Sequence, residues 1–196
     1  MDDASPSDEE LIERSQSGDP EAFAGLVERY QDYMHNAVVH LVGPGHDADD
    51  LTQEVFMKAY RGLSGFQKRS RFSTWLYGIM LNCVRSHWRK KGRGPDVMSL
   101  EAGGEEDKSP PDPPARKQVR PDERMLQQER VKVVRASIRK LPHDLREVVV
   151  LRDLQGLAYR EMAHTLDLPL GTVKSRLARG RRALRDEIAP ILGDEL

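Results

Sequence analysis

The stretch LAYREMAHTLDLPLGTVKSRLARGRRALRDEIAPIL, residues 157–192, is the part of this sequence that decides its fold. Apolar residues recur at helical spacing over residues 159–166 and again from about Gly171 onward. Residues 167–169, Asp-Leu-Pro, form a short turn between these two helical segments. In the second segment, the residues directed to the core are Val173, Leu177 and Leu184. Two helices joined by a short turn, the second of them basic, predict a helix-turn-helix that enters a major groove.

The second helix of this motif is cationic along its polar side, with six Lys or Arg and no Asp or Glu from Leu170 to Arg185. Its N-terminal part, which reaches base edges, carries the candidates for groove contacts Thr172, Lys174, Ser175 and Arg176. The candidates for phosphate contacts are Arg179, Arg181 and Arg182. The alternative is an ordinary helical hairpin with a solvated basic face. The lack of acids argues against it, since the preceding segment contains Glu161 and Asp167.

Upstream of the motif, the sequence predicts one helix over residues 121–140 and another from Pro142 to about Leu154. Residues 94–124 are rich in Pro, Gly and charge and poor in apolar residues, which predicts a flexible linker. The expected domains are therefore residues 1–93 and 125–196. Strand signals are nearly absent, so we expect an all-α fold of two small helical domains.

The first domain shows its own helix starts. Ser7 and Glu10 form a possible capping box, and Asp19-Pro20 begins a helix that runs to about Leu41. The sequence GPGHD ends that helix, and Asp47 or Asp49 starts another helix through about residue 63.

The last helix of this domain lies in RFSTWLYGIMLNCVRSHWRKKGR, residues 71–93. Its predicted buried stripe consists of Phe72, Trp75, Leu76, Ile79, Met80, Cys83, Val84 and His87. Its predicted exposed face consists of Thr74, Tyr77, Gly78, Asn82, Arg85 and Arg89. From residue 66 to residue 94 there are eight Lys or Arg and no acid, which indicates a polyanion or a strongly acidic protein as partner.

Both tryptophans of the chain lie in this segment. Trp75 points into the apolar stripe and is interpreted as a core anchor, whereas Trp88 either stacks on a base or closes the domain. Asn82, on the exposed face, could hydrogen-bond an unpaired base. Base-gripping groups beside a cationic track are typical of single-strand binding, and the loop over residues 66–71 has the same mixture.

The composition and charge of the chain argue against several other classes of function. The net charge is only −1, yet residues 1–60 hold fourteen acids against three bases, so the acidic part faces something other than nucleic acid. No apolar run is long enough for a membrane span, and the acidic N-terminus is unlike a secretory signal, which predicts a cytoplasmic protein. The single cysteine, Cys83, is expected to be buried and inert. No catalytic, metal or cofactor motif was found, so we expect no enzyme activity, no metal and no cofactor.

Four stretches together resemble the extracytoplasmic-function (group IV) sigma factors of bacterial RNA polymerase: residues 8–30, 47–66, 72–91 and 138–184. The resemblance implies a dissociable subunit that directs promoter-specific initiation. Its implied partners are core polymerase, through the clamp coiled coil of the largest subunit and the flap, promoter DNA and an anti-sigma factor. Membrane insertion is not implied.

The family's motifs assign residues to three surfaces. Those matching its core-docking helix are Asp47, Asp50, Leu51, Gln53, Glu54, Phe56 and Lys58. Those matching its minus-10 reader are Phe66, Lys68, Arg69, Arg71, Trp75, Asn82, Arg85, Trp88, Arg89 and Lys90. The seven candidates on the basic helix of the helix-turn-helix match its minus-35 reader.

The chain departs from the family pattern at Asp167, where Gly is common, and at Gly180, where Ala is usual. Asp tolerates a left-handed backbone. Glycine inside a helix costs about 0.8–1 kcal/mol, and here it either softens the helix end or allows close approach to a partner.

Two other classes of protein are disfavoured. A response-regulator-type activator shares a similar helix-turn-helix, but no phosphoacceptor domain precedes the linker and the segment from residue 66 to residue 94 has no role there. A nucleic-acid-processing enzyme predicts a clustered acid or metal site, and the sequence shows none.

Overall fold

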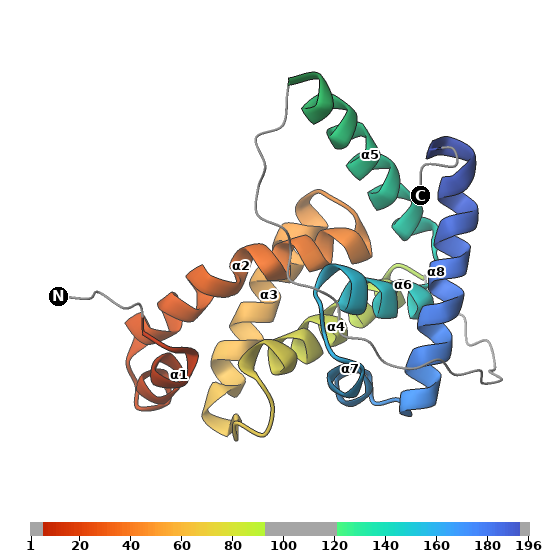
Figure 1. The fold of residues 1–196 in the computed structure, drawn as a ribbon. Coiled ribbons are helices and arrows are strands. Elements are labelled where there is room, and N and C mark those ends of the chain that lie inside the picture. The colour runs from red at the N-terminus through yellow and green to blue at the C-terminus, as the bar shows by residue number, and fades with distance from the viewer. Residues whose placement is uncertain (1–5, 93–120, 193–196) are drawn as a thin grey trace. The chain divides into compact units, whose positions relative to one another are not determined.

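The computed structural model describes residues 6–92 and 121–192 of the chain (Figure 1). Every regular element in these two ranges is a helix, so the expected all-α class is confirmed for the described part. The chain divides into two compact units, residues 1–94 and 95–196. The predicted linker lies outside the described residues except for residues 121–124, which form the start of a helix.

The helices of the first unit pack around α2. In chain order the elements are α1 (Asp8–Gln16), α2 (Pro20–Val42), α3 (His46–Gly62), the 3-10 turn η1 (Leu63–Gly65) and α4 (Phe72–Lys90). Helix α2 contacts α1, α3 and α4, and α3 also contacts α4. The core between them is apolar, and its fully buried members include Leu26, Met34, Val55, Leu76 and Met80. Burial of this kind contributes roughly 1.5–3 kcal/mol per large side chain.

The predicted helix starts are confirmed with small shifts. The Ser7 hydroxyl accepts from the Glu10 amide at 3.3 Å, and the Glu10 carboxylate accepts from the Ser7 amide at 2.7 Å, which completes the capping box. Asp19 caps α2 by accepting from the backbone amides of residues 21 and 22, with Pro20 in the first turn. Helix α3 begins at His46, slightly before the predicted acids, and Gly45 caps it without a side-chain hydrogen bond.

The exposed face predicted for α4 is partly wrong. Thr74 and Tyr77 are buried, with 3% and 5% of their surface exposed. The reason is that α4 packs against both α2 and α3, so its buried arc is wider than one apolar stripe. Within the predicted stripe itself, Trp75, Ile79 and His87 are half-buried, and the other members are buried. Cys83 is 1% exposed, and this burial raises the pKa of its thiol.

The second unit contains α5 (Pro121–Lys140), α6 (His143–Val149), the π-helical turn η2 (Val150–Leu154), α7 (Tyr159–Leu166) and α8 (Leu170–Leu192). Helix α6 continuing into η2 corresponds to the single helix predicted from residue 142 to about residue 154. Helix α8 packs against α5, α6 and α7 (Figure 1). The guanidinium of buried Arg152 donates to the Leu157 carbonyl at 2.9 Å, which fixes the connection from η2 to α7.

The helix-turn-helix is confirmed as α7 and α8. Asp167 between them has φ 54° and ψ 51°, the left-handed backbone expected for the residue at the family's usual glycine position. Val173 and Leu177 are buried, and Leu184 is half-buried. The turn therefore directs one face of α8 onto the unit and leaves the other face accessible.

Candidate nucleic-acid and protein interfaces

The exposed face of α4 carries an amide beside several cations. Asn82, Arg89 and Lys90 are exposed, and Arg85 is half-buried on the same helix. No Asp or Glu occurs anywhere in α4. Asn82 offers both donor and acceptor groups, and cations within one or two helical turns can neutralise phosphates. This face is therefore suited to a single strand with accessible bases.

The two tryptophans of α4 have different environments. Trp88 is 4% exposed, so the alternative in which it closes the domain is the one that the structure supports. Trp75 is half-buried and its ring lies 4.9 Å from that of Phe66 and 5.6 Å from that of Phe72. Trp75 is thus part of an aromatic cluster, as the core-anchor interpretation expected, with some of its surface accessible.

The loop between η1 and α4 combines buried and exposed members. Phe66 is 8% exposed, whereas Lys68, Arg69 and Arg71 are exposed. Lys68 has φ 55°, and its Nζ lies 2.5 Å from a Glu13 carboxylate oxygen. A left-handed conformation at a residue other than glycine is held in place by its surroundings. The loop therefore presents its cations from a fixed backbone.

The residues that match a core-docking helix lie on α3, where some are exposed and some are buried. Asp50, Gln53 and Glu54 are exposed, while Leu51 and Phe56 are 4% and 8% exposed. The remaining two are both paired. Asp47 accepts from Lys91 Nζ at 2.5 Å, and Lys58 Nζ lies 2.8 Å from Glu54. The Lys91 contact is the main reason that the pKa of Asp47 is lowered.

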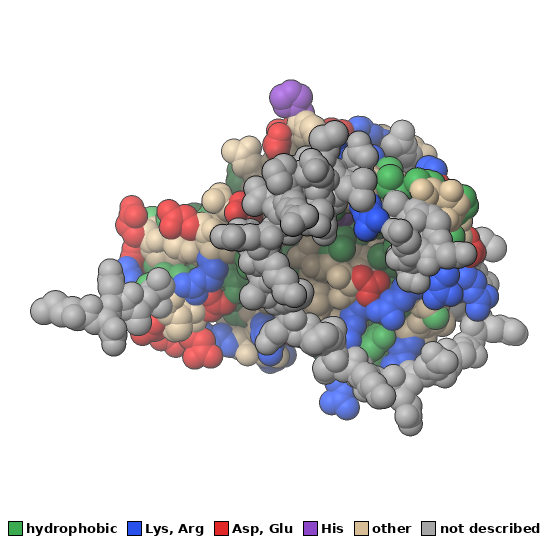
Figure 2. Space-filling view, turned by 45° about the horizontal axis from the view of Figure 1, so that its top comes forward, with side chains coloured by type: hydrophobic (Ala, Val, Ile, Leu, Met, Phe, Trp, Pro, Cys, Tyr) green, Lys and Arg blue, Asp and Glu red, His purple; other side chains and the backbone are tan. Residues whose placement is uncertain are grey.

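A groove runs between α2 and α3 beside these residues. Its wider part has a volume of about 490 Å³ and is lined by Val27, Gln31, Asp32, His35, Asp49, Asp50, Thr52, Gln53 and Phe56. An adjoining part of about 350 Å³ is lined by Phe23, Gln53, Phe56, Met57 and Tyr60. Figure 2 shows acidic side chains gathered toward the end of the first unit that carries its N-terminus. Within the groove itself, the wider part contains three carboxylates, Asp32, Asp49 and Asp50, whereas the adjoining part is lined mainly by apolar and aromatic side chains.

The apolar part of this groove was not predicted from the sequence. Met57 and Tyr60 are 48% and 55% exposed, and the Tyr60 ring lies 4.9 Å from that of Phe23 in an edge-on arrangement. Met57 and Tyr60 are three positions apart and therefore share one face of α3. That spacing was visible in the sequence, but whether an apolar face is covered by another helix depends on packing.

The exposed polar face of α8 is narrower than the sequence predicted. Ser175 is 6% exposed, and its hydroxyl donates to the Thr172 carbonyl at 3.0 Å, so its predicted exposure is wrong. Because α8 contacts α5, α6 and α7, its buried arc extends beyond the face that carries Val173 and Leu177. Thr172 and Lys174 are half-buried, and Arg182 is exposed.

Several cations of α8 are held by neighbours in the same unit. Arg181 donates to both oxygens of Asp153, at 2.6 and 3.2 Å, and this pairing raises its pKa. Arg176 Nε lies 3.5 Å from Asp144. The Nε and Nη2 atoms of half-buried Arg179 have no hydrogen-bond partner among the described residues. The two unpartnered atoms of Arg179 are buried, so the helix combines cations paired within the unit with exposed cations such as Arg182.

The π-helical turn also supports the basic helix through an aromatic ring. The Arg152 guanidinium lies 4.7 Å from the centre of the Tyr159 ring, and Lys174 Nζ lies 5.6 Å from it. Cations within about 6 Å of a ring centre are attracted to its face. Lys174 of α8 is thus oriented by the Tyr159 ring of α7.

Comparisons with known proteins match both units. The model of Sigma-70 region 2 matches residues 26–94, and that of Sigma-70 region 4 matches residues 132–184. The ECF RNA polymerase sigma-E factor of Escherichia coli K12 is 40% identical over 95% of this chain and 96% of its own length. The RNA polymerase sigma-H factor of Pseudomonas aeruginosa is 39% identical over 94% of this chain and 95% of its own length.

Solved structures show the same fold. CnrH, solved in complex with the cytosolic domain of CnrY, has a TM-score of 0.65 and 26% identity, covering 92% of this chain and 96% of its own. The sigma factor RpoE of Bartonella quintana, solved with the anti-sigma factor NepR, has a TM-score of 0.63 and 23% identity. That comparison covers 85% of this chain and 96% of RpoE, and at this identity it supports the fold alone.

Proposed function

This chain belongs to the ECF sigma factors of RNA polymerase, and from that premise we propose which of its surfaces bind the polymerase and which bind the promoter. A sigma factor directs promoter-specific initiation and has no catalytic activity of its own, because RNA synthesis belongs to the polymerase. The proposed domains are residues 1–93 for region 2, 94–124 for the linker and 125–196 for region 4.

The α2–α3 groove is the proposed docking surface for the clamp coiled coil of the polymerase's largest subunit. Exposed Asp50, Gln53 and Glu54 would make polar contacts, and Leu51 and Phe56 would keep α3 in place. Acidic residues beside an apolar strip favour a partner helix that is basic on one side and apolar on the other.

The exposed face of α4, with the loop over residues 66–71, is the proposed minus-10 reader. The observation that carries this assignment is the exposed Asn82 on a helix without acids, beside exposed Arg89 and Lys90. Asn82 would hydrogen-bond a base of the opened strand while the cations hold phosphates. Phe66 and Trp88 would act by packing, because both are buried.

Helix α8 is the proposed minus-35 reader. Thr172, Lys174 and Arg176 lie on its first turns, where a recognition helix reaches base edges, and Arg179 and Arg182 would hold phosphates. Buried Ser175 and the paired Arg181 would support the helix. The second unit is also the proposed contact for the polymerase flap.

Two further proposals concern the cell. We place the protein in the cytoplasm with its polymerase, and no helix among the described residues is long and apolar enough to cross a membrane. We also propose an anti-sigma factor that covers the same surfaces, by similarity to CnrH, which was solved in complex with the cytosolic domain of CnrY. An anti-sigma factor bound to the α2–α3 groove would exclude the polymerase.

Run-off transcription with purified core polymerase tests the proposed function. The templates are promoter fragments from the source genome, and core alone is the control. We expect RNA from defined start sites only when the chain is added. If the chain binds duplex DNA but never gives start-site-specific RNA with core, the proposed function is wrong.

A further inference from the structure

Helix α1 makes direct contact with the loop that we propose as part of the minus-10 reader. Gln16 lies at the last position of α1, and its side-chain amide donates to the Leu63 carbonyl at 2.8 Å and the Phe66 carbonyl at 3.0 Å. These acceptors are 47 and 50 positions away in the sequence. The Gln16 side chain therefore bonds to the first residue of η1 and to Phe66, the first residue of the loop that follows it.

A second contact joins the same two segments. Glu13 lies one turn before Gln16 on α1, and its carboxylate pairs with Lys68 Nζ at 2.5 Å. Lys68 is the loop residue with the left-handed backbone, φ 55°. Because this conformation is unfavourable for a residue with a Cβ, neighbouring contacts are needed to hold it. Gln16 supplies such contacts at the start of the loop and Glu13 supplies one at its middle.

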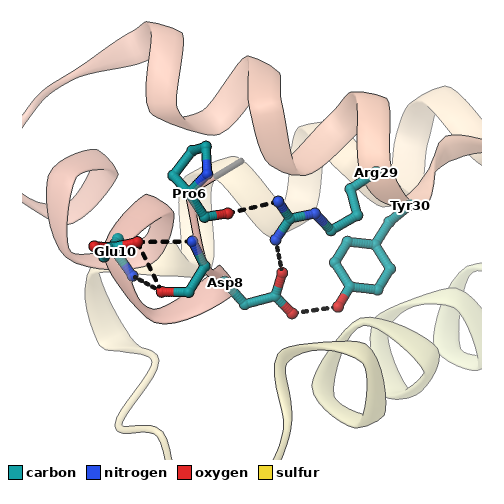
Figure 3. A network of polar contacts seen from close by, with 6 residues as sticks. Pro6, Asp8, Glu10, Arg29 and Tyr30 are labelled. Carbon is teal, nitrogen blue, oxygen red and sulfur yellow. Dashed lines mark hydrogen bonds and ion pairs between the residues drawn. The ribbon is translucent and has the colours of Figure 1, made fainter. Parts of the chain in front are cut away.

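The other end of α1 is fixed to α2, as Figure 3 shows. Asp8 accepts hydrogen bonds from both Arg29 and Tyr30, and the Arg29 guanidinium also donates to the Pro6 carbonyl at 2.6 Å. The pKa of the Tyr30 hydroxyl is raised by burial and by its bond to Asp8. Helix α1 is thus held at its first turn by α2 and at its last turn by η1 and the loop.

The loop is held from its inner side by aromatic contacts. The Phe66 ring lies 6.0 Å from Phe72 and 4.9 Å from Trp75, and the Tyr30 ring lies 5.4 Å from Phe72. Phe66 is therefore fixed twice, through its ring by this cluster and through its carbonyl by Gln16. Since Tyr30 also binds Asp8, the α1 anchor and the aromatic cluster share a residue.

We propose that α1 is a positioning element for the loop over residues 66–71, and that Gln16 is the residue through which it acts. The inference rests on the proposed role of that loop in reading the minus-10 strand. Helix α1 precedes the part of the chain that the Sigma-70 region 2 model matches, which begins at residue 26. A loop already held in its binding conformation loses less freedom when DNA binds, so discrimination between bases is sharper.

The test compares Gln16→Glu and Gln16→Met, which keep the approximate length of the side chain and remove its N–H donors. Glu9→Gln, at an exposed position of the same helix, is the matched control. A promoter is first selected from a library of randomised minus-10 sequences with wild-type holoenzyme. Transcription is then measured on that promoter and on each single-base substitution of its minus-10 element.

The readout is the ratio of activities between the selected base and its substitutions. A variant that is only less stable lowers activity on every template equally and leaves this ratio unchanged. We expect both Gln16 variants to lower the ratio by about 3- to 10-fold, the range that one or two lost hydrogen bonds produce. The control should keep the wild-type ratio.

The outcomes separate the inference from the proposed function. If Gln16→Glu and Gln16→Met both keep the wild-type ratio while Asn82→Ala lowers it, α1 has no positioning role and the minus-10 assignment stands. If wild-type holoenzyme selects no minus-10 sequence at all, the assignment of the loop is itself wrong.

Discussion

Gly180 of α8 lies against Val149 of α6 so closely that a Cβ on the glycine would be 2.8 Å from Val149 Cγ2. It would also be 3.2 Å from the Leu145 carbonyl oxygen. The glycine is therefore required by the packing of α6 on α8, and the close approach involves a helix of its own unit. This packing explains why α8 has a glycine here, although glycine is about 0.8–1 kcal/mol less favourable than alanine inside a helix.

Gly180→Ala should consequently destabilise the second unit, although alanine is the better helix former. Overpacking costs roughly 1–3 kcal/mol, which exceeds the gain in propensity. We expect a net loss of about 1 kcal/mol and a melting temperature lower by roughly 4–8 °C. Differential scanning calorimetry measures this change in melting temperature.

Two further variants check the cause. Gly171→Ala, at a position where a Cβ meets nothing within 4 Å, should not lower the melting temperature. Adding Val149→Ala to Gly180→Ala should cost less than the sum of the two single changes, because one clash disappears. An unchanged or raised melting temperature for Gly180→Ala alone would contradict the packing account.

The ion pair between Asp47 and Lys91 predicts a pH effect. Because the pKa of Asp47 is lowered from its ordinary value of 3.8, the pair stabilises the folded state above that value. The stabilisation is lost as the pH falls through the lowered pKa. Lys91→Ala should return the pKa of Asp47 toward 3.8, which a carboxyl titration by NMR detects. An Asp47 pKa that Lys91→Ala leaves unchanged would show that the pair does not form in solution.

The cations of α8 should differ in their effect on DNA binding. Arg182 is exposed, whereas Arg181 is bound to Asp153. Arg182→Ala should weaken binding to all sequences and reduce the slope of log K against log salt by about 0.9, since one phosphate contact is lost. Arg181→Ala should change the slope less. Binding titrations at several salt concentrations give both slopes, and equal reductions would contradict the assignment.

The thiol of Cys83 should react slowly in the native protein. The side chain is 1% exposed and burial raises its pKa, so little thiolate is present and reagents are excluded. An aromatic disulfide reagent at pH 8 should modify it much more slowly than it modifies the protein in denaturant. Equal rates with and without denaturant would mean that the packing of α4 against α2 and α3 does not cover this residue in solution.

Local signals in the sequence predicted most of the helices. Ser7 with Glu10 and Asp19 with Pro20 are caps that act within one turn, so their positions could be read directly. The left-handed backbone of Asp167 followed from the resemblance, which places it at a position where the family commonly has glycine. Such features depend on residues close together in the chain, which is why they were predictable.

Features that depend on packing between helices were not predicted. Thr74 and Tyr77 are buried because α4 has two neighbours, and a periodic pattern assigns only one buried stripe. The contact of Gln16 with Leu63 and Phe66 joins distant positions and has no local signal. Ser175 was predicted to be exposed because it is polar, but it is buried in the folded unit.

In the proposed function, α4 opens the minus-10 region while α8 reads the minus-35 element. The most direct measurement is fluorescence of 2-aminopurine placed in the minus-10 region of a promoter bound by holoenzyme, together with a footprint over the minus-35 element. Asn82→Ala should keep the minus-35 footprint and lose most of the fluorescence increase, whereas Lys174→Ala should weaken both. Full opening with Asn82→Ala, or an unchanged minus-35 footprint with Lys174→Ala, would contradict the account.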